Sequence, residues 1–242
     1  MEDSHSHRVK QSQRIQTSIL SKPEKKALNW LAARQPAWVT SDFLTGVGCV
    51  GTILIALGYA LSGKDVNFLW LATFGLLVNW YGDSLDGTLA RYRDTQRPVY
   101  GFFVDHMIDC MSEVAMFVGL GLSPLIHFNL AMLVLVCYLL MSIYVYISAH
   151  LKGEFKLTYA KLGPTEFRAV AAIVNTVLIY VKPIREFSLD LTLLGHGCSL
   201  TLLDLVAIAV ILVLLVSLVV NFFKDAKEYA RLEPKIKNGK RE

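Results

Sequence analysis

Six long apolar segments dominate the 242-residue chain, and each is long enough, or nearly long enough, to cross a lipid bilayer. A membrane-spanning helix needs roughly 20 mostly apolar residues, because each residue adds about 1.5 Å to its length. A mean hydropathy of +0.45 is also too high for an ordinary soluble domain. The sequence therefore predicts an all-α, polytopic membrane protein with six transmembrane helices, at residues 43–62, 66–91, 99–123, 126–148, 164–181 and 200–223.

The polar segments outside these spans predict the rest of the organisation. Before the first span, Leu28 and Leu31 share one helical face, which is typical of an amphipathic helix lying at the membrane surface. Ser21 and Glu24 have the spacing of a capping box at the start of this helix. The chain is thus expected to comprise a mobile N-terminal segment, an interfacial helix, a six-helix membrane domain and a basic tail, at residues 1–20, 21–41, 42–225 and 226–242.

The basic residues predict the orientation, because cytoplasmic loops of membrane proteins are enriched in Lys and Arg. With the N-terminus in the cytoplasm, all but three of the 24 basic residues fall on the cytoplasmic side, the exceptions being Lys64, Lys182 and Arg185. Both termini and the loop after the second span are therefore expected to be cytoplasmic. Contact with the bilayer accounts for the charge of the tail, so no nucleic-acid partner is expected.

Acidic residues inside the second and third spans are costly at membrane depth, and such residues are usually functional. They stand at helical spacing with small residues, in a stripe of Asp83, Asp86, Gly87 and Ala90 on the second span and a stripe of Gly101, Asp105 and Asp109 on the third. A short loop joins the two spans, so the helices are expected to be antiparallel neighbours. The four carboxylates are then expected to converge near the cytoplasmic surface.

Four like charges in a site of low dielectric repel one another unless they are protonated or bound to cations. An all-oxygen set of ligands suits Mg²⁺, Mn²⁺ or Ca²⁺ rather than zinc. Two divalent ions would balance four carboxylates and could bind a diphosphate. The small side chains of Gly87 and Ala90 leave room for a ligand beside the carboxylates, and Arg91 offers donors for phosphate oxygens.

The stretch DSLDGTLAR at residues 83–91, followed by GFFVDHMID at residues 101–109, resembles the signature of the CDP-alcohol phosphotransferase family. The shared pattern is two Asp three residues apart, then Gly, then Ala-Arg, then after a spacer Gly and two Asp at four-residue steps. The spacer between Arg91 and Gly101 has nine residues, one more than is commonest in the family. The longer spacer extends a loop and leaves both helical stripes in place.

The resemblance implies a function for each matching position. Asp83, Asp86 and Asp105 would hold two Mg²⁺ or Mn²⁺ ions on the diphosphate of a CDP-activated donor, and Asp109 would complete the metal site and act as the catalytic base. The nucleotide site would be lined by Gly87, Ala90, Arg91 and Gly101. The reaction would transfer a substituted phosphate to an acceptor alcohol and release CMP, in phospholipid biosynthesis. Members of the family are commonly homodimers.

The acceptor is less well indicated by the sequence. Candidate contacts are Glu113, one turn beyond Asp109, and a group before and within the fifth span, Lys161, Glu166 and Arg168. Glu166 and Arg168 could instead form an ion pair that closes the end of that span. His106, beside a predicted metal ligand, is interpreted as a packing or supporting residue.

Two features favour a particular branch of the family without deciding it. The GPTE sequence at residues 163–166 and the Asp-His pair resemble choline and ethanolamine phosphotransferases, which are usually longer. The donor would then be CDP-choline or CDP-ethanolamine and the acceptor diacylglycerol, whereas the compact chain favours CDP-diacylglycerol as donor. More distant alternatives are a membrane prenyltransferase and a divalent-metal transporter. The acidic residues crowd one half of the bilayer, which disfavours a transport path.

Overall fold

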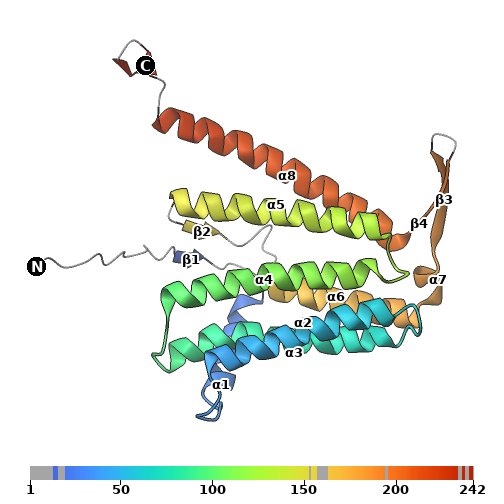
Figure 1. The fold of residues 1–242 in the computed structure, drawn as a ribbon, viewed down its shortest axis with the longest axis horizontal. Helices are drawn as coiled ribbons and strands as arrows, with labels where there is room; N and C mark the ends of the chain where they lie inside the picture. Colours follow the sequence, from blue (N-terminus) through green and yellow to red (C-terminus); the bar gives the residue numbers. More distant parts are fainter. Residues whose placement is uncertain are drawn as a thin grey trace, which may run out of the picture.

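Six long helices lie side by side in the computed structural model, with two short helices and three small strand pairs around them (Figure 1). The structure describes residues 13–15, 20–152, 154–156, 163–193, 196–233, 236–237 and 240–241. The long helices are α2 (Ser41–Leu61), α3 (Phe68–Tyr92), α4 (Pro98–Gly121), α5 (Phe128–Lys152), α6 (Pro164–Tyr180) and α8 (Leu202–Leu232). Each predicted span therefore corresponds to one helix, and the all-α class is confirmed.

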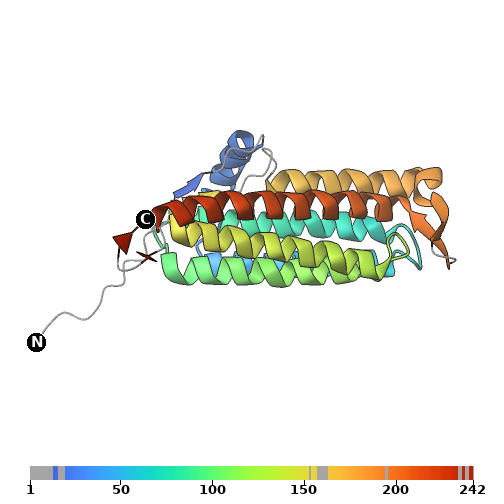
Figure 2. The ribbon, with the colours of Figure 1, turned by 90° about the horizontal axis from the view of Figure 1, so that it is seen from above.

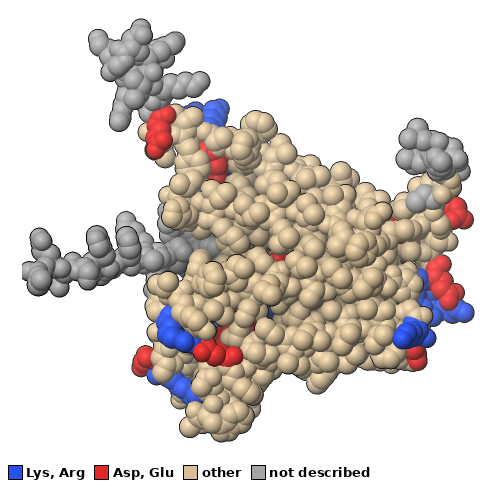
Figure 3. Space-filling model, viewed as in Figure 1, with Lys and Arg blue, Asp and Glu red and all other residues tan. Residues whose placement is uncertain are grey.

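Three of these helices, α2, α5 and α8, are long and apolar enough to cross a membrane by length and composition. The α3 and α4 helices carry the acidic stripes, and α6 has 17 residues. Figure 3 shows that the charged side chains on this face lie mostly at the two ends of the bundle, while its middle is uncharged. A middle with few charged side chains between two charged ends is the surface expected of a membrane protein.

The smaller elements lie at the ends of the bundle. They are α1 (Ser21–Ala32), α7 (Lys182–Arg185), the antiparallel pair β3 (Ser188–Leu193) and β4 (His196–Thr201), the parallel pair β1 (Gln13–Ile15) and β2 (Glu154–Lys156), and the antiparallel pair β5 (Ile236–Lys237) and β6 (Lys240–Arg241). The sixth span was expected from residue 200, but β4 includes Thr201, whose side chain caps the start of α8. The α8 helix then continues to Leu232, past the predicted end at residue 223.

The order of packing places the acidic helices in the interior. The α3 helix packs between α2 and α6, α4 packs on α2 and α5, and α8 packs on α5 (Figures 1 and 2). The end of α3 and the start of α4 meet at the end of the bundle opposite to α7 and the β3–β4 hairpin (Figure 1). The acidic stripes therefore lie toward the α3–α4 end.

Glycine residues let α2 and α3 approach until their backbones touch. A Cβ atom at Gly58 of α2 would lie 2.4 Å from the backbone nitrogen of Ala72, and one at Gly82 of α3 would lie 2.2 Å from the backbone nitrogen of Gly48. Real side chains do not tolerate such distances to a backbone atom. Gly58 of α2 therefore has a packing role, whereas a Cβ atom at Gly46 on the same helix would face open space.

The α1 helix docks on the α3–α4 end of the bundle through a shared apolar cluster and through Glu24. Leu28 and Ala32 of α1 are buried against Leu85 and Leu89 of α3. The predicted capping box is wrong: Leu20 is the N-cap residue, and it makes no side-chain cap hydrogen bond. The Glu24 carboxylate instead accepts hydrogen bonds from Trp80 Nε1 (2.9 Å) on α3 and from Thr165 on α6. Tertiary hydrogen bonds have replaced the local cap.

Replacing Gly58 by Ala is expected to destabilise the bundle. The added methyl group would meet the backbone of α3, and overpacking of this kind costs roughly 1–3 kcal/mol. Thermal unfolding of the detergent-solubilised protein measures the effect. Gly46→Ala on the same helix is the matched control and should leave the unfolding temperature nearly as it is. Equal effects of the two substitutions would contradict the close α2–α3 contact.

Candidate active site

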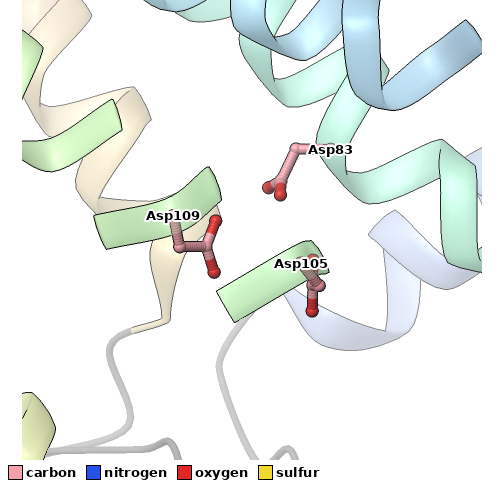
Figure 4. Close-up of side chains that lie close together, drawn as sticks. All are labelled: Asp83, Asp105 and Asp109. Atoms are coloured by element: carbon pink, nitrogen blue, oxygen red, sulfur yellow. The ribbon is translucent and has the colours of Figure 1, made fainter. Parts of the chain in front are cut away.

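Three aspartates from α3 and α4 face one another across the junction of these helices (Figure 4). Asp83 projects from α3, and Asp105 and Asp109 project from successive turns of α4. One carboxylate oxygen of each lies within 4.8 Å of the others. The helices can bring them together because only residues 93–97 separate α3 from α4. The predicted convergence of the two acidic stripes is therefore present in the structure.

The carboxylates border a cavity of about 10 Å³, which has room for about one water molecule or one small ion. Its lining residues are Thr45, Gly48, Asn79, Asp83, Asp86, Asp105, Ile108, Asp109 and Ser112. Asp105 stands seven residues after the start of α4, so the cavity lies roughly 10 Å inside that end of the helix. The ligating atoms are all oxygen and anionic, which fits Mg²⁺, Mn²⁺ or Ca²⁺.

Asp86, the fourth predicted ligand, lines the same cavity but is not one of the three converging carboxylates. It is buried, with 9% of its surface exposed. Its side chain accepts hydrogen bonds from Thr45 Oγ1 (2.7 Å) on α2 and from the backbone N–H of Gly87. These donors hold Asp86 in place beside the cluster, although they also occupy its oxygens in this state.

Arg168 on α6 supplies a positive charge to the cluster. Its Nη2 atom lies 2.6 Å from Oδ2 of Asp83, and its Nε donates to Asn79 Oδ1 (2.9 Å). The guanidinium is largely buried, with 16% of the side chain exposed. The alternative of an ion pair between Glu166 and Arg168 is therefore wrong, since the arginine pairs with a predicted metal ligand instead.

A chain of hydrogen bonds continues from Asn79 across the bundle. Asn79 Nδ2 donates to Thr52 Oγ1 (3.2 Å) on α2, and Thr52 Oγ1 donates to Ser112 Oγ (3.0 Å) on α4. All three side chains are buried. Together with Arg168, this chain links α6, α3, α2 and α4 directly beneath the carboxylates. It fixes the relative positions of the helices that carry the site.

The predicted nucleotide-binding positions leave open space beside the carboxylates. A Cβ atom at Gly87 would meet nothing closer than Arg91 Nη1 at 3.3 Å, and one at Gly101 would meet nothing within 4 Å. Neither glycine is thus needed for helix packing. Arg91 lies on the same stripe, where its Nη2 donates to Thr88 Oγ1 (3.1 Å), and Ala90 is half-buried. The two glycines are free to accommodate a ligand.

The predicted acceptor residues separate into different environments. Glu166 is buried, and its two oxygens accept from the backbone nitrogens of Gly163 (2.9 Å) and Leu20 (2.7 Å). It therefore caps α6 and ties down the chain before α1. Lys161 lies outside the described residues. Glu113 lies on the same helix as Asp109, one turn further from the α3–α4 end.

His106 is held by its own helix and by aromatic neighbours. Its Nδ1 atom lies 2.8 Å from the carbonyl oxygen of Phe102 and 3.7 Å from Oδ2 of Asp105. The imidazole stacks on the Phe102 ring at 4.0 Å and meets the Tyr146 ring edge-on at 5.3 Å. These contacts match the interpretation of His106 as a packing residue next to the site.

Two curated proteins are similar to this chain, while no protein-family model matches it. A phosphatidylinositol phosphate synthase from Cutibacterium acnes is 34% identical over 98 residues, which are 40% of this chain and 45% of that protein. Cholinephosphotransferase 1 from Xenopus laevis is 31% identical over 110 residues, which are 43% of this chain and 27% of that protein. Both are members of the CDP-alcohol phosphotransferase family. The chain is similar to these two members of the family over about two fifths of its length.

The chain spans less than half the length of each of these relatives in the matched regions. The resemblance to the CDP-alcohol phosphotransferases that the Asp motif indicated is confirmed by this homology.

Four polar residues around the motif were not identified from the sequence, namely Thr45, Thr52, Asn79 and Ser112. A signal for them exists: Asn79 stands one turn before Asp83, and Thr45 and Thr52 share one face of α2 with Gly48.

Replacing Arg168 by Ala is expected to make this CDP-alcohol phosphotransferase homologue more dependent on divalent cations for stability. Removing one partner of a largely buried ion pair costs roughly 3 kcal/mol, because the remaining charge is left uncompensated. A bound cation would take over this role, so Mn²⁺ should raise the unfolding temperature of the variant more than that of the wild type. Thermal unfolding with EDTA and with Mn²⁺ measures the difference.

The control for this experiment is Lys182→Ala at the opposite end of the bundle, where the side chain is 70% exposed. Its response to Mn²⁺ should equal that of the wild type. An identical Mn²⁺ shift for Arg168→Ala and the wild type would show that the arginine does not offset the charge of the carboxylates.

Proposed function

We propose that this protein is a metal-dependent CDP-alcohol phosphotransferase of phospholipid biosynthesis. It transfers a substituted phosphate from a CDP-alcohol to an acceptor alcohol and releases CMP. The observation that carries the proposal is the convergence of Asp83, Asp105 and Asp109, on two adjoining helices, at positions that match the family motif. The homology to two phosphotransferases supports the reaction class.

The residues present fit a divalent cation by the chemistry of their donors. Asp83, Asp105 and Asp109 would hold one ion between them, and Asp86 at the same cavity would contribute to a second. Such ions, either Mg²⁺ or Mn²⁺, would neutralise the diphosphate and stabilise CMP as the leaving group. Binding of the ions would also remove the repulsion among the carboxylates.

The protein's own residues then position the reactants and move one proton. Gly87 and Gly101 leave space for the nucleotide, and Arg91 donates hydrogen bonds to phosphate oxygens. The oxygen of the acceptor hydroxyl attacks the phosphorus that carries the donor alcohol. Asp109 accepts the proton of this hydroxyl during the attack. The bond from this phosphorus to the CMP oxygen breaks, and CMP leaves with the bonding electrons.

The donor and acceptor follow from weaker arguments. We favour CDP-diacylglycerol as donor and a soluble alcohol as acceptor. The alternative is CDP-choline or CDP-ethanolamine as donor and diacylglycerol as acceptor. The names of the two relatives include one inositol phosphate enzyme and one choline enzyme, so they leave both directions open.

The membrane topology completes the proposal. The α3 and α4 helices have 25 and 24 residues, enough to span a bilayer of roughly 30 Å alongside α2 and α5. Their carboxylates face the interior of the bundle rather than lipid (Figure 4). We infer six spans with both termini and the active site on the cytoplasmic side, where soluble nucleotides such as CMP are found. We also infer that the protein forms a homodimer and has no nucleic-acid partner.

Asp109→Asn is expected to abolish CMP release, by at least about 100-fold, because the amide cannot accept the hydroxyl proton. The binding of a CDP-alcohol should remain measurable, since other carboxylates stay in place. The assay combines purified protein, Mn²⁺ or Mg²⁺, CDP-diacylglycerol or CDP-choline, and a panel of alcohols, and it measures CMP. Asp190→Asn, on the exposed β3 strand, is the control with wild-type turnover.

Full activity of Asp109→Asn would refute the assignment of the base. The absence of CMP from the wild-type protein with every donor and acceptor would refute the reaction class. A membrane prenyltransferase or a divalent-metal transporter, the two other classes that a carboxylate site in a membrane allows, would release no CMP in this assay.

A further inference from the structure

Glu113 on α4 has a carboxylate oxygen with no partner. Its Oε2 atom is buried and makes no hydrogen bond within the part of the chain that the structure describes. None of the ion pairs formed by the described residues includes Glu113 either. Leaving a buried carboxylate oxygen without a hydrogen bond is costly, so such an atom in a native protein points to a ligand.

Two tyrosines of α5 lie near this carboxylate. The hydroxyl of Tyr138 interacts with Glu113. Tyr146 lies near both Glu113 and Asp109, and its hydroxyl interacts with Cys110. The two tyrosines are eight residues apart, so they share the face of α5 that packs on α4. A carboxylate beside aromatic rings is the combination that recognises organic ammonium groups.

The position of Glu113 relative to the catalytic base sets the size of the ligand. Glu113 follows Asp109 by four residues on α4, so it lies on the same face about 6 Å deeper along the helix. A hydroxyl oxygen held at Asp109 and a cation held at Glu113 would therefore be separated by a short spacer. Two carbon atoms between oxygen and nitrogen, as in ethanolamine, choline and serine, match this spacing.

We propose that Glu113, with Tyr138 and Tyr146, selects a substrate headgroup with a positively charged amine two carbons from its alcohol oxygen. This inference rests on the proposed function and names the substrate class of the same site. The amino alcohol could arrive free, as the acceptor for CDP-diacylglycerol, or as the CDP-activated donor for diacylglycerol. A free amino alcohol attacks the phosphorus with its own oxygen, whereas in a CDP-activated donor this oxygen is already bonded to the phosphorus and stays there while the bond to CMP breaks. In both cases the amine lies two carbons from an oxygen that ends on the reacting phosphorus, so the recognition chemistry is the same.

The test compares cationic and neutral probes on wild type, Glu113→Gln and Glu113→Asp. In the donor arm, binding of CDP-choline, CDP-ethanolamine and CDP-glycerol is measured with Mn²⁺ and without acceptor. In the acceptor arm, KM for ethanolamine, serine and glycerol is measured by CMP release from CDP-diacylglycerol. Glu113→Gln keeps the shape of the side chain and removes its charge, whereas Glu113→Asp keeps the charge.

We expect wild type to prefer the cationic probes in one of the two arms, and this arm identifies the source of the amine. Glu113→Gln should weaken the cationic probes of that arm about 10-fold more than the neutral probe. Glu113→Asp, which keeps the charge, should recover part of the preference for cationic probes. A variant that had lost its fold would show no such recovery. Glu186→Gln, at the far end of the bundle, is the control and should keep the wild-type preference.

Equal effects of Glu113→Gln on cationic and neutral probes, or no preference of wild type in either arm, would overturn this inference. The proposed function would survive that result provided that wild type still releases CMP and Asp109→Asn does not. A wild-type protein that binds no CDP-alcohol and releases no CMP would remove both proposals together.

Discussion

The repulsion among three carboxylates within 4.8 Å of one another is the constraint on which the rest of this structure depends. In a site of low dielectric such a cluster is unstable without compensating charge. Among the described residues, the guanidinium of Arg168 reaches Asp83 from α6. Three carboxylates held this close together favour the binding of cations. In the proposed reaction, metal ions bound to the diphosphate would supply this positive charge.

The close packing of α2 on α3 keeps this unfavourable arrangement in place. In a membrane the hydrophobic effect does not drive helices together, because lipid tails are as apolar as the side chains. Close backbone contact and hydrogen bonds between helices take its place. The glycines of α2 and α3 allow that contact, and Asn79, Thr52 and Ser112 then reach one another across three helices. Packing and hydrogen bonding thus act together to hold the carboxylates at fixed positions.

The sequence predicted the six helices and the convergence of the Asp stripes because both follow from local periodicity and one short loop. It did not predict the partners of Glu24, Glu166 or Arg168, because those depend on which helices become neighbours. Ser21 and Glu24 illustrate the difference: their spacing fits a local cap, but Trp80 and Thr165 supply donors that only the assembled bundle brings close. The charge of Arg168 was recognised in the sequence, and its pairing with Asp83 required the fold.

The division of labour among the helices has a physical reason. The three helices that satisfy a simple test of length and composition, α2, α5 and α8, contain few charged residues in their apolar stretches. The helices that carry the carboxylates and Arg168, namely α3, α4 and α6, do not satisfy this test. Their polar groups become tolerable in a bilayer only when they face one another, since each group then finds a partner away from lipid. The polar residues needed for chemistry therefore also hold the site-bearing helices together.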